Sequence, residues 1–103
     1  MGKSIITKYT NVCLICGTTH NVEQHHLIEG TRRKLSDEDG LIVPLCSYHH
    51  REALLASVHL NTEMNTMSKI IGQLAWERNY CAEGHSVEEA RQAFLERYSK
   101  SYI

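Results

Sequence analysis

The sequence lacks the features that mark membrane and secreted proteins. No apolar run approaches the length that spans a bilayer, and no signal-peptide pattern stands at its start, so we expect no membrane contact and a cytoplasmic location. The net charge is only −1, which excludes an overall basic field for nucleic acid and leaves such binding to local patches. With 103 residues, the chain is expected to form one domain, residues 1–103, whose modest core a metal would supplement.

Cysteine and histidine form the most informative pattern. Four cysteines are present, and in a reducing compartment they are more often metal ligands or free thiols than disulfides. Cys13 and Cys16 have the spacing of a zinc knuckle, and Cys46 and His49 repeat that spacing. Together these four side chains predict a closed, tetrahedral, structural zinc site. Buried thiols or a redox pair are the alternatives for the first two, and Cys81, which has no partner at ligand spacing, is expected to be a buried free thiol.

Further histidines flank this predicted zinc site. His25 and His26 are adjacent on a predicted strand, so their side chains point to opposite faces of it. His50 directly follows His49 on a predicted helix, where neighbouring residues point about 100° apart. The two members of each pair therefore serve different sites. His59 has two interpretations: it completes a metal shell, or it caps the helix that follows.

The first half of the chain is organised by turns and short extended runs. Residues 22–28 and 41–45 predict two strands. The polar segment 31–40 between them is too long for a tight hairpin and has room for one helical turn at 36–39. A helix is then expected to begin near Ser47. The predicted order is strand, loop, strand, helix.

Residues 61–103 are expected to form a helical scaffold. A first helix can begin at a cap on Asn61 or Thr62 and run to about Tyr80. Its apolar residues recur at three- and four-residue steps and predict one buried stripe: Met64, Met67, Ile71, Leu74 and Ala75. A capping box over 86–89 predicts the start of a second helix. That helix is expected to present one face to the core: Val87, Ala90, Phe94 and Tyr98.

Four runs in the first half have a combined spacing that is more specific than any one of them: Cys13-x2-Cys16; Glu23-Gln24-His25-His26-Leu27-Ile28; Gly30-Thr31-x-Arg33-Lys34-x-Ser36 with Gly40-Leu41; and Leu45-Cys46-x2-His49-His50 with Val58-His59. This spacing resembles the HNH (His-Me finger) endonucleases with an added zinc clamp, in particular small phage-associated HNH proteins. The resemblance covers about half of the chain, within residues 1–60. It implies an α+β fold in which a small ββα-metal motif is pinned by a zinc knuckle site and followed by two C-terminal helices.

The resemblance also implies a role for each histidine. His26 matches the general base that deprotonates a water, and His25 and His50 match ligands of a catalytic divalent ion, Mg²⁺ or Mn²⁺. The implied activity is hydrolysis of DNA phosphodiester bonds that leaves 5′-phosphate and 3′-hydroxyl ends. Contacts to DNA, without strong sequence specificity, are expected from the basic side chains near this site: Arg32, Arg33, Lys34 and Arg51.

The family pattern usually contains an Asn that orients the base, and segment 27–45 has no Asn. Ser36, Asp37, Asp39 or the backbone near Gly40 would then replace it. The alternative function is a catalytically inactive zinc-binding module for a nucleic acid or protein partner. A zinc hydrolase with another type of substrate is disfavoured, because the chain has no HExxH helix. A homodimer is left open by the sequence.

Overall fold

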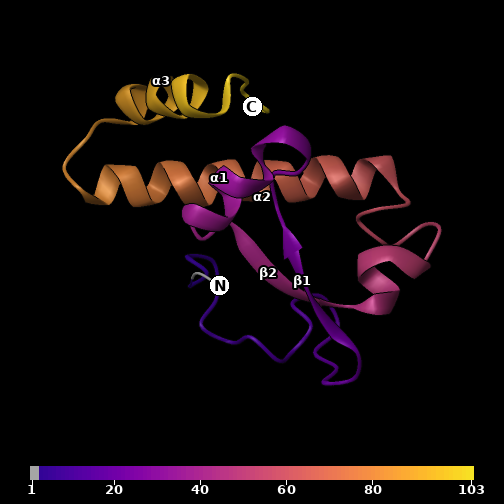
Figure 1. Ribbon diagram of the computed structural model, residues 1–103. Helices are drawn as coiled ribbons and strands as arrows, with labels where there is room; N and C mark the ends of the chain where they lie inside the picture. The colour runs from indigo at the N-terminus through magenta and orange to yellow at the C-terminus, as the bar shows by residue number, and fades with distance from the viewer. Residues whose placement is uncertain (1–2) are drawn as a thin grey trace.

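The chain folds into a small α+β structure built on a two-stranded sheet (Figure 1). This computed structural model describes residues 3–103, so the first two residues of the predicted domain lie outside the described part. The elements follow one another as β1 (Val22–His26), η1 (Gly30–Arg32), α1 (Arg33–Glu38), β2 (Ile42–Cys46), η2 (Tyr48–Glu52), α2 (Thr62–Ala82) and α3 (Val87–Tyr98). The predicted α+β class is confirmed.

The two strands pair antiparallel, in a register that places Cys46 at one end of the sheet and His26 at the other. Every residue of β2 is buried. Pro44 lacks an N–H, but its carbonyl accepts a hydrogen bond from the backbone of Leu14 at 2.9 Å. Because the N–H and C=O of a strand residue point the same way, the missing donor faces away from β1 and the pairing of the two strands loses no hydrogen bond.

The connection between the strands differs from the polar loop expected over 31–40. It forms η1 and α1, two short helices in succession. The buried hydroxyl of Ser36 donates to the carbonyl of Leu41 at 2.8 Å and accepts from the backbone N–H of Ile28 at 3.3 Å. Gly40 ends the connection with φ +74°, and a Cβ there would collide with the backbone carbonyl of Lys3. Ser36 thus holds η1 and α1 against the sheet. The sequence pattern does not reveal the two hydrogen-bond partners of this side chain.

A helix begins at Tyr48, directly after Ser47 as expected, but it consists of a single wide turn. This turn, η2, has π-type hydrogen bonds and spans five residues. The helix does not continue into Leu54 and Leu55, whose exposed fractions of 71% and 81% show that no core lies beside them. The backbone N–H of His59 instead returns to the carbonyl of His50 at 3.1 Å, which holds these two histidines at a fixed spacing.

The predicted helix starts of the second half are confirmed. Asn61 caps α2, because its side chain accepts a hydrogen bond from the backbone N–H of Met64 at 2.9 Å. The helix continues to Ala82, slightly beyond the expected end. Before α3, Ser86 and Glu89 form the predicted capping box, in which each side chain accepts a hydrogen bond from the other residue's backbone.

The predicted buried stripe of α2 is wrong for three of its five residues, whereas Met64 and Ala75 are half-buried and Met64 packs against the core. Met67, Ile71 and Leu74 are 58%, 42% and 51% exposed, and the buried residues of the helix are Ser68, Gly72, Gln73 and Glu77. The physical reason is close approach: a Cβ on Gly72 would lie only 3.0 Å from that of Leu27, so the side of the helix that carries Gly72 is the one that fits there. Val87 of α3 is also exposed, at 65%, whereas the rest of its predicted face is buried.

The polar side chains on the inner face of α2 have partners. Gln73 donates to Glu77 at 2.7 Å, and Glu77 also accepts from Arg91 at 2.7 Å. The backbone N–H of Tyr102 donates to the Gln73 carbonyl oxygen at 2.7 Å. Burial of these groups is tolerated because each is hydrogen-bonded.

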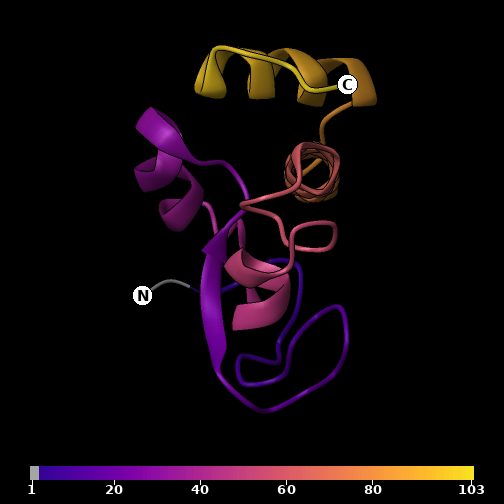
Figure 2. The ribbon, with the colours of Figure 1, turned by 90° about the vertical axis from the view of Figure 1, so that its right-hand side faces the viewer.

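One hydrophobic core contains residues from both halves of the chain: Cys13, Leu27, Ile28, Leu41, Val43, Leu45, Cys46, Val58, Phe94 and Tyr98. The carboxylate of Asp39, at the end of α1, accepts hydrogen bonds from the Trp76 indole at 2.9 Å and from the Tyr98 hydroxyl at 2.7 Å. It thereby ties α2 and α3 to the connection between the strands. In the view along α2, the sheet and α1 lie on one side of this helix and α3 lies above it (Figure 2). Across residues 3–103, no helix is both long and apolar enough to cross a membrane.

Candidate metal centres

The sulfur and nitrogen atoms of Cys13, Cys16, Cys46 and His49 all lie within 4.8 Å of one another and can hold a metal ion. The knuckle supplies the first two thiols, and its turn is closed by a 2.9 Å hydrogen bond from the Gly17 N–H to the Cys13 carbonyl. The end of β2 and the turn η2 supply the other two ligands. The fold therefore brings the four predicted ligands together in one cluster.

The spacing of this cluster fits a tetrahedral ion. Zinc–sulfur bonds of about 2.3 Å and zinc–nitrogen bonds of about 2.05 Å place two sulfurs about 3.8 Å apart, and a sulfur and a nitrogen about 3.6 Å apart. Sγ of Cys16 lies 3.8 Å from Sγ of Cys46. Nδ1 of His49 lies 3.3 Å from Sγ of Cys46 and 3.9 Å from Sγ of Cys13. The donors already stand where such an ion would require them.

The thiols of this cluster differ in acidity. Burial opposes ionisation of Cys13, but hydrogen bonds from backbone N–H groups, that of Cys16 first, outweigh it and lower its pKa to about 6. Burial, with the neighbouring thiols of Cys13 and Cys16, raises the pKa of Cys46. Cys13 thus forms a thiolate readily, whereas ionisation of Cys46 is opposed. A bound cation removes this opposition, because it stabilises every thiolate that contacts it.

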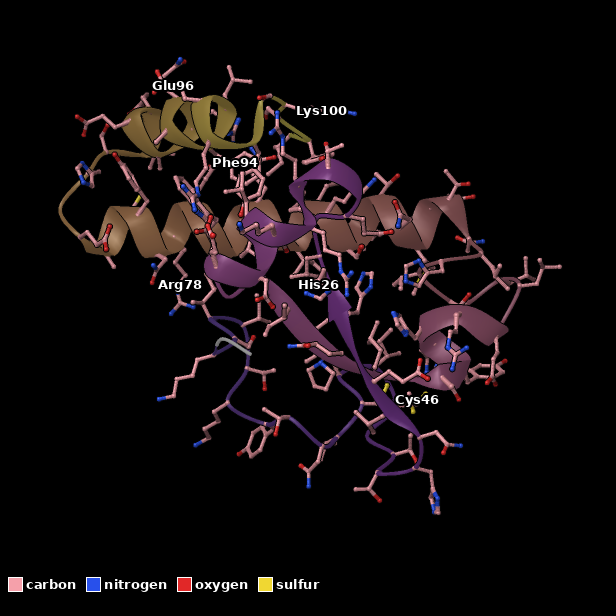
Figure 3. The ribbon with its side chains drawn as sticks, in the orientation of Figure 1. His26, Cys46, Arg78, Phe94, Glu96 and Lys100 are labelled. Atoms are coloured by element: carbon pink, nitrogen blue, oxygen red, sulfur yellow. The ribbon has the colours of Figure 1, made fainter. Side chains whose placement is uncertain are left out.

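A second cluster consists of His25, His50 and His59, each of which directs a ring nitrogen to within 4.8 Å of the other two. Nε2 of His50 lies 3.0 Å from Nε2 of His59. His25 comes from β1, His50 from η2, and His59 from the loop before α2. Cys46 and His26 lie at opposite ends of the two-stranded sheet. Cys46 is beside the sulfur atoms, and His26 lies toward α2 (Figure 3).

Two glutamates orient the rings of the histidine cluster. Oε1 of Glu23 lies 2.7 Å from Nδ1 of His50, and Oε2 of Glu29 lies 3.5 Å from Nδ1 of His59. A carboxylate favours the N–H form of the nitrogen it faces, which leaves the Nε2 lone pairs of both rings directed into the cluster. No pattern in the sequence singles out these glutamates as site residues. The only signal for Glu29 was its position four residues after His25.

The buried ring of His25 lacks a partner that a metal would supply. The ring is 1% exposed, and its Nε2 has no hydrogen-bond partner among residues 3–103. Burial, followed by the nearby imidazoles of His50 and His59, lowers the pKa of His25 to about 3. The ring is therefore neutral and keeps a lone pair available. Such a buried, unsatisfied nitrogen beside two oriented imidazoles fits a divalent ion of the kind that histidine binds.

His26 does not belong to this cluster. Its Nε2 lies 3.2 Å from Oδ1 of Asp37, and its Nδ1 accepts a hydrogen bond from Nε of Arg33 at 3.3 Å. An acceptor at Nδ1 places the proton on Nε2, which then donates to Asp37. His26 and the three clustered histidines nevertheless line the same hollow of about 280 Å³. The adjacent histidines of β1 thus contribute to one site in two different ways.

Of the predicted replacements for the family Asn, only Asp37 contacts His26. Ser36 is occupied in closing the connection to β2, and Asp39 is occupied by α2 and α3. Asp37 comes from α1, the helix that the sequence did not predict at this length. Because α1 forms, the Asp37 carboxylate lies beside the ring of His26.

The predicted DNA-contacting residues lie in three different settings. Arg32 and Lys34 lie on η1 and α1, where Arg32 donates to Ser99 at 2.7 Å. Arg33 contacts the ring of His26, as described above. Arg51 forms a two-point ion pair with Glu23, at 2.9 and 2.5 Å, and this contact, ahead of His50, lowers the pKa of Glu23 to about 2. The charge of Arg51 is therefore already paired beside the histidine cluster.

Comparison with known proteins gave no relatives. No family model matches the chain, no curated protein matches it, and no solved structure matches it. The features that indicate a function are the two clusters, His26 with its contacts, and the hollow that these histidines share.

Proposed function

We propose that the chain is a metal-dependent endonuclease of the HNH type that hydrolyses DNA phosphodiester bonds. The observation that carries this proposal is the separation of roles on β1: His25 joins a three-histidine cluster, while its neighbour His26 stays outside the cluster and faces the same hollow. In the proposed ββα-metal motif, β1 and β2 are the strands and the short turn η2 stands in place of the helix.

The two clusters would have different tasks. Three thiolates and one imidazole fill a tetrahedral shell, so the cysteine cluster suits a structural zinc ion. Three imidazoles leave coordination positions free, so the histidine cluster suits a catalytic ion. Nitrogen donors favour Mn²⁺ over Mg²⁺, because Mg²⁺ prefers oxygen ligands. When bound, such an ion would stabilise negative charge on the phosphate and on the leaving 3′-oxygen.

His26 is the proposed general base. Its Nε2–H is held by Asp37, so Nδ1 is the nitrogen that would take the proton of the attacking water. Arg33 occupies Nδ1 in this structure, and a guanidinium is also a phosphate donor. We infer that Arg33 leaves the imidazole for the substrate phosphate, which frees Nδ1. The water oxygen then bonds to phosphorus as His26 takes its proton, the bond to the 3′-oxygen breaks, and the 3′-oxygen takes a proton from solvent, which gives a 5′-phosphate and a 3′-hydroxyl end.

Asp37 is the proposed positioning residue, in the role that the family gives to Asn. Asp37→Ala should lower the cleavage rate by about 10- to 100-fold, a typical effect of a residue that orients a catalytic group. Ring nitrogen shifts in NMR would separate this role from a general loss of structure, because they report which nitrogen of His26 carries the proton. Arg33 also favours the Nε2–H form, so the cleavage rate decides: an Asp37→Ala protein that cuts as fast as the parent would refute the assignment.

Plasmid nicking in Mn²⁺ and in Mg²⁺ tests the activity. His26→Ala should lose on the order of 10²- to 10⁴-fold in rate, since a free water can partly replace the base. His20→Ala is the matched control, because His20 is exposed and lies outside both clusters. A parent protein that binds zinc and DNA but does not cut would instead support the alternative, a catalytically inactive zinc-binding module.

A further inference from the structure

The outer face of α2 is apolar although it faces solvent. Met67, Ile71 and Leu74 are 58%, 42% and 51% exposed, whereas Gln73 and Glu77 of the same helix are buried. This distribution is the reverse of the usual one for a surface helix, whose polar side faces water. An exposed run of large apolar side chains is typical of a surface that another protein covers.

These three residues form one continuous stripe. Steps of four and three residues place Met67, Ile71 and Leu74 on one side of a helix, and the half-buried Ile70 lies at its flank. Gly72 meets Leu27 on the inner side of α2, and helical geometry places the stripe away from that contact. In the view along α2, the sheet and α1 lie below and to the left of this helix and α3 lies above it, so these elements leave its right-hand side open (Figure 2).

Charges of opposite sign close the two ends of the stripe. Glu63 precedes Met67 by four residues, and Arg78 follows Leu74 by four residues. Both side chains are exposed, and neither forms a salt bridge within the described residues 3–103. The pattern is therefore symmetric about a point between Ile70 and Ile71, with a negative end and a positive end.

We propose that α2 packs antiparallel against α2 of a second copy of this chain, across a twofold axis at the centre of the stripe. Met67 then lies against Leu74 of the partner subunit, and Glu63 pairs with Arg78 of the partner subunit. A twofold interface requires each patch to complement itself, and this sequence does so only in the antiparallel direction. A parallel pair would place like charges together at both ends.

The size of the surface sets the expected affinity. α2 has 21 residues, or about 31 Å of helix. One helix pair of that length lies at the small end of specific interfaces, so association in the micromolar range is expected. This inference does not depend on the proposed nuclease activity, and its test needs no DNA.

Sedimentation equilibrium of the zinc-loaded full chain, from about 1 to about 100 µM, measures the association. The mass should rise from the 11.8 kDa of one chain toward twice that value. Leu74→Glu should weaken dimerisation by at least about 100-fold, because it buries a charge in the interface. Leu55→Glu, at an exposed leucine outside the stripe, should leave it unchanged. A parent chain that stays monomeric throughout this range overturns the proposal.

Charge exchange tests the antiparallel direction. Glu63→Arg alone and Arg78→Glu alone should each weaken the dimer several-fold, because each places like charges opposite one another. The double variant should recover the parent affinity. Glu63 also lies in the first turn of α2, so thermal melts of all three variants separate loss of helix stability from loss of the interface. A double variant that fails to recover while its melting temperature matches the parent refutes the antiparallel pairing.

Discussion

Cys16→Ser is the most informative single change for the cysteine cluster. Cys16 is exposed, so serine fits its place without a clash, and the change removes one ligand of the proposed zinc ion. That ion links the knuckle to the end of β2, because it joins Cys16 to Cys46 across 30 residues of chain. A cross-link that closes a loop of this length removes about 4 kcal/mol of conformational entropy from the unfolded chain.

This magnitude is large for a chain of 103 residues. Domains of that size are stable by about 5–15 kcal/mol, so losing the cross-link should lower the melting temperature by about 15–30 °C. Circular dichroism melts, with zinc content measured by elemental analysis, would give both quantities. Strong chelation of the parent should produce a comparable loss.

Cys81→Ser is the matched control, because the Cys81 thiol has a single weak contact, at 3.7 Å to the carbonyl of Ser86. It should change neither the zinc content nor the melting temperature by more than a few degrees. A folded parent protein that contains no zinc, or a Cys16→Ser protein that melts with the parent, would show that the cluster is not a structural metal site.

Three further predictions concern other parts of the chain. His50→Ala should abolish binding of Mn²⁺ at the proposed catalytic site in calorimetry, whereas His26→Ala should keep it; equal losses would mean that His26 is a ligand. Asp39→Ala should cost about 2–4 kcal/mol in chemical unfolding, because four hydrogen bonds from α2 and α3 lose their acceptor, and a loss below about 0.5 kcal/mol would contradict this. Replacing Arg32 and Lys34 by Ala should flatten the dependence of log K for DNA on log salt by up to about 2, while an unchanged slope would exclude both as phosphate contacts.

Local signals in the sequence predicted the helix starts well. Asn61 and the pair Ser86–Glu89 act on backbone groups three residues away, so the sequence alone contains both partners of each hydrogen bond. Cys13 and Cys16 are likewise close in the sequence, so their spacing alone predicts the knuckle. The joining of the knuckle to Cys46 was expected from a repeated spacing, and the structure brings these residues together.

The buried face of α2 could not be predicted in this way. Helical periodicity shows that Met67, Ile71 and Leu74 share a face, but it does not show what covers that face. The side that packs inward was decided by Gly72 against Leu27 and by partners for Gln73 from the far end of the chain. Hydrogen bonds between residues so far apart in the chain produce no periodic pattern in the sequence.

The hydrogen bonds of His26, and the glutamates that contact the clustered histidines, could not be predicted for a similar reason. The sequence leaves Asp37 as one of four alternatives, and only the position of α1 brings it to the His26 ring. Glu23 and Arg51 are 28 residues apart, and their pairing requires both β1 and the turn η2. Arg51 stays a predicted DNA contact, and the structure adds that its charge is paired with Glu23.

His49 and His50 are consecutive residues that belong to different clusters. Nδ1 of His49 lies 3.3 Å from Sγ of Cys46, and Nε2 of His50 lies 3.0 Å from Nε2 of His59. The two rings are carried by one short turn, so any ion that holds His49 also fixes the direction in which His50 points. In the proposed enzyme, the structural zinc would therefore do more than stabilise the fold: through a single peptide bond, it would set the geometry of the catalytic cluster.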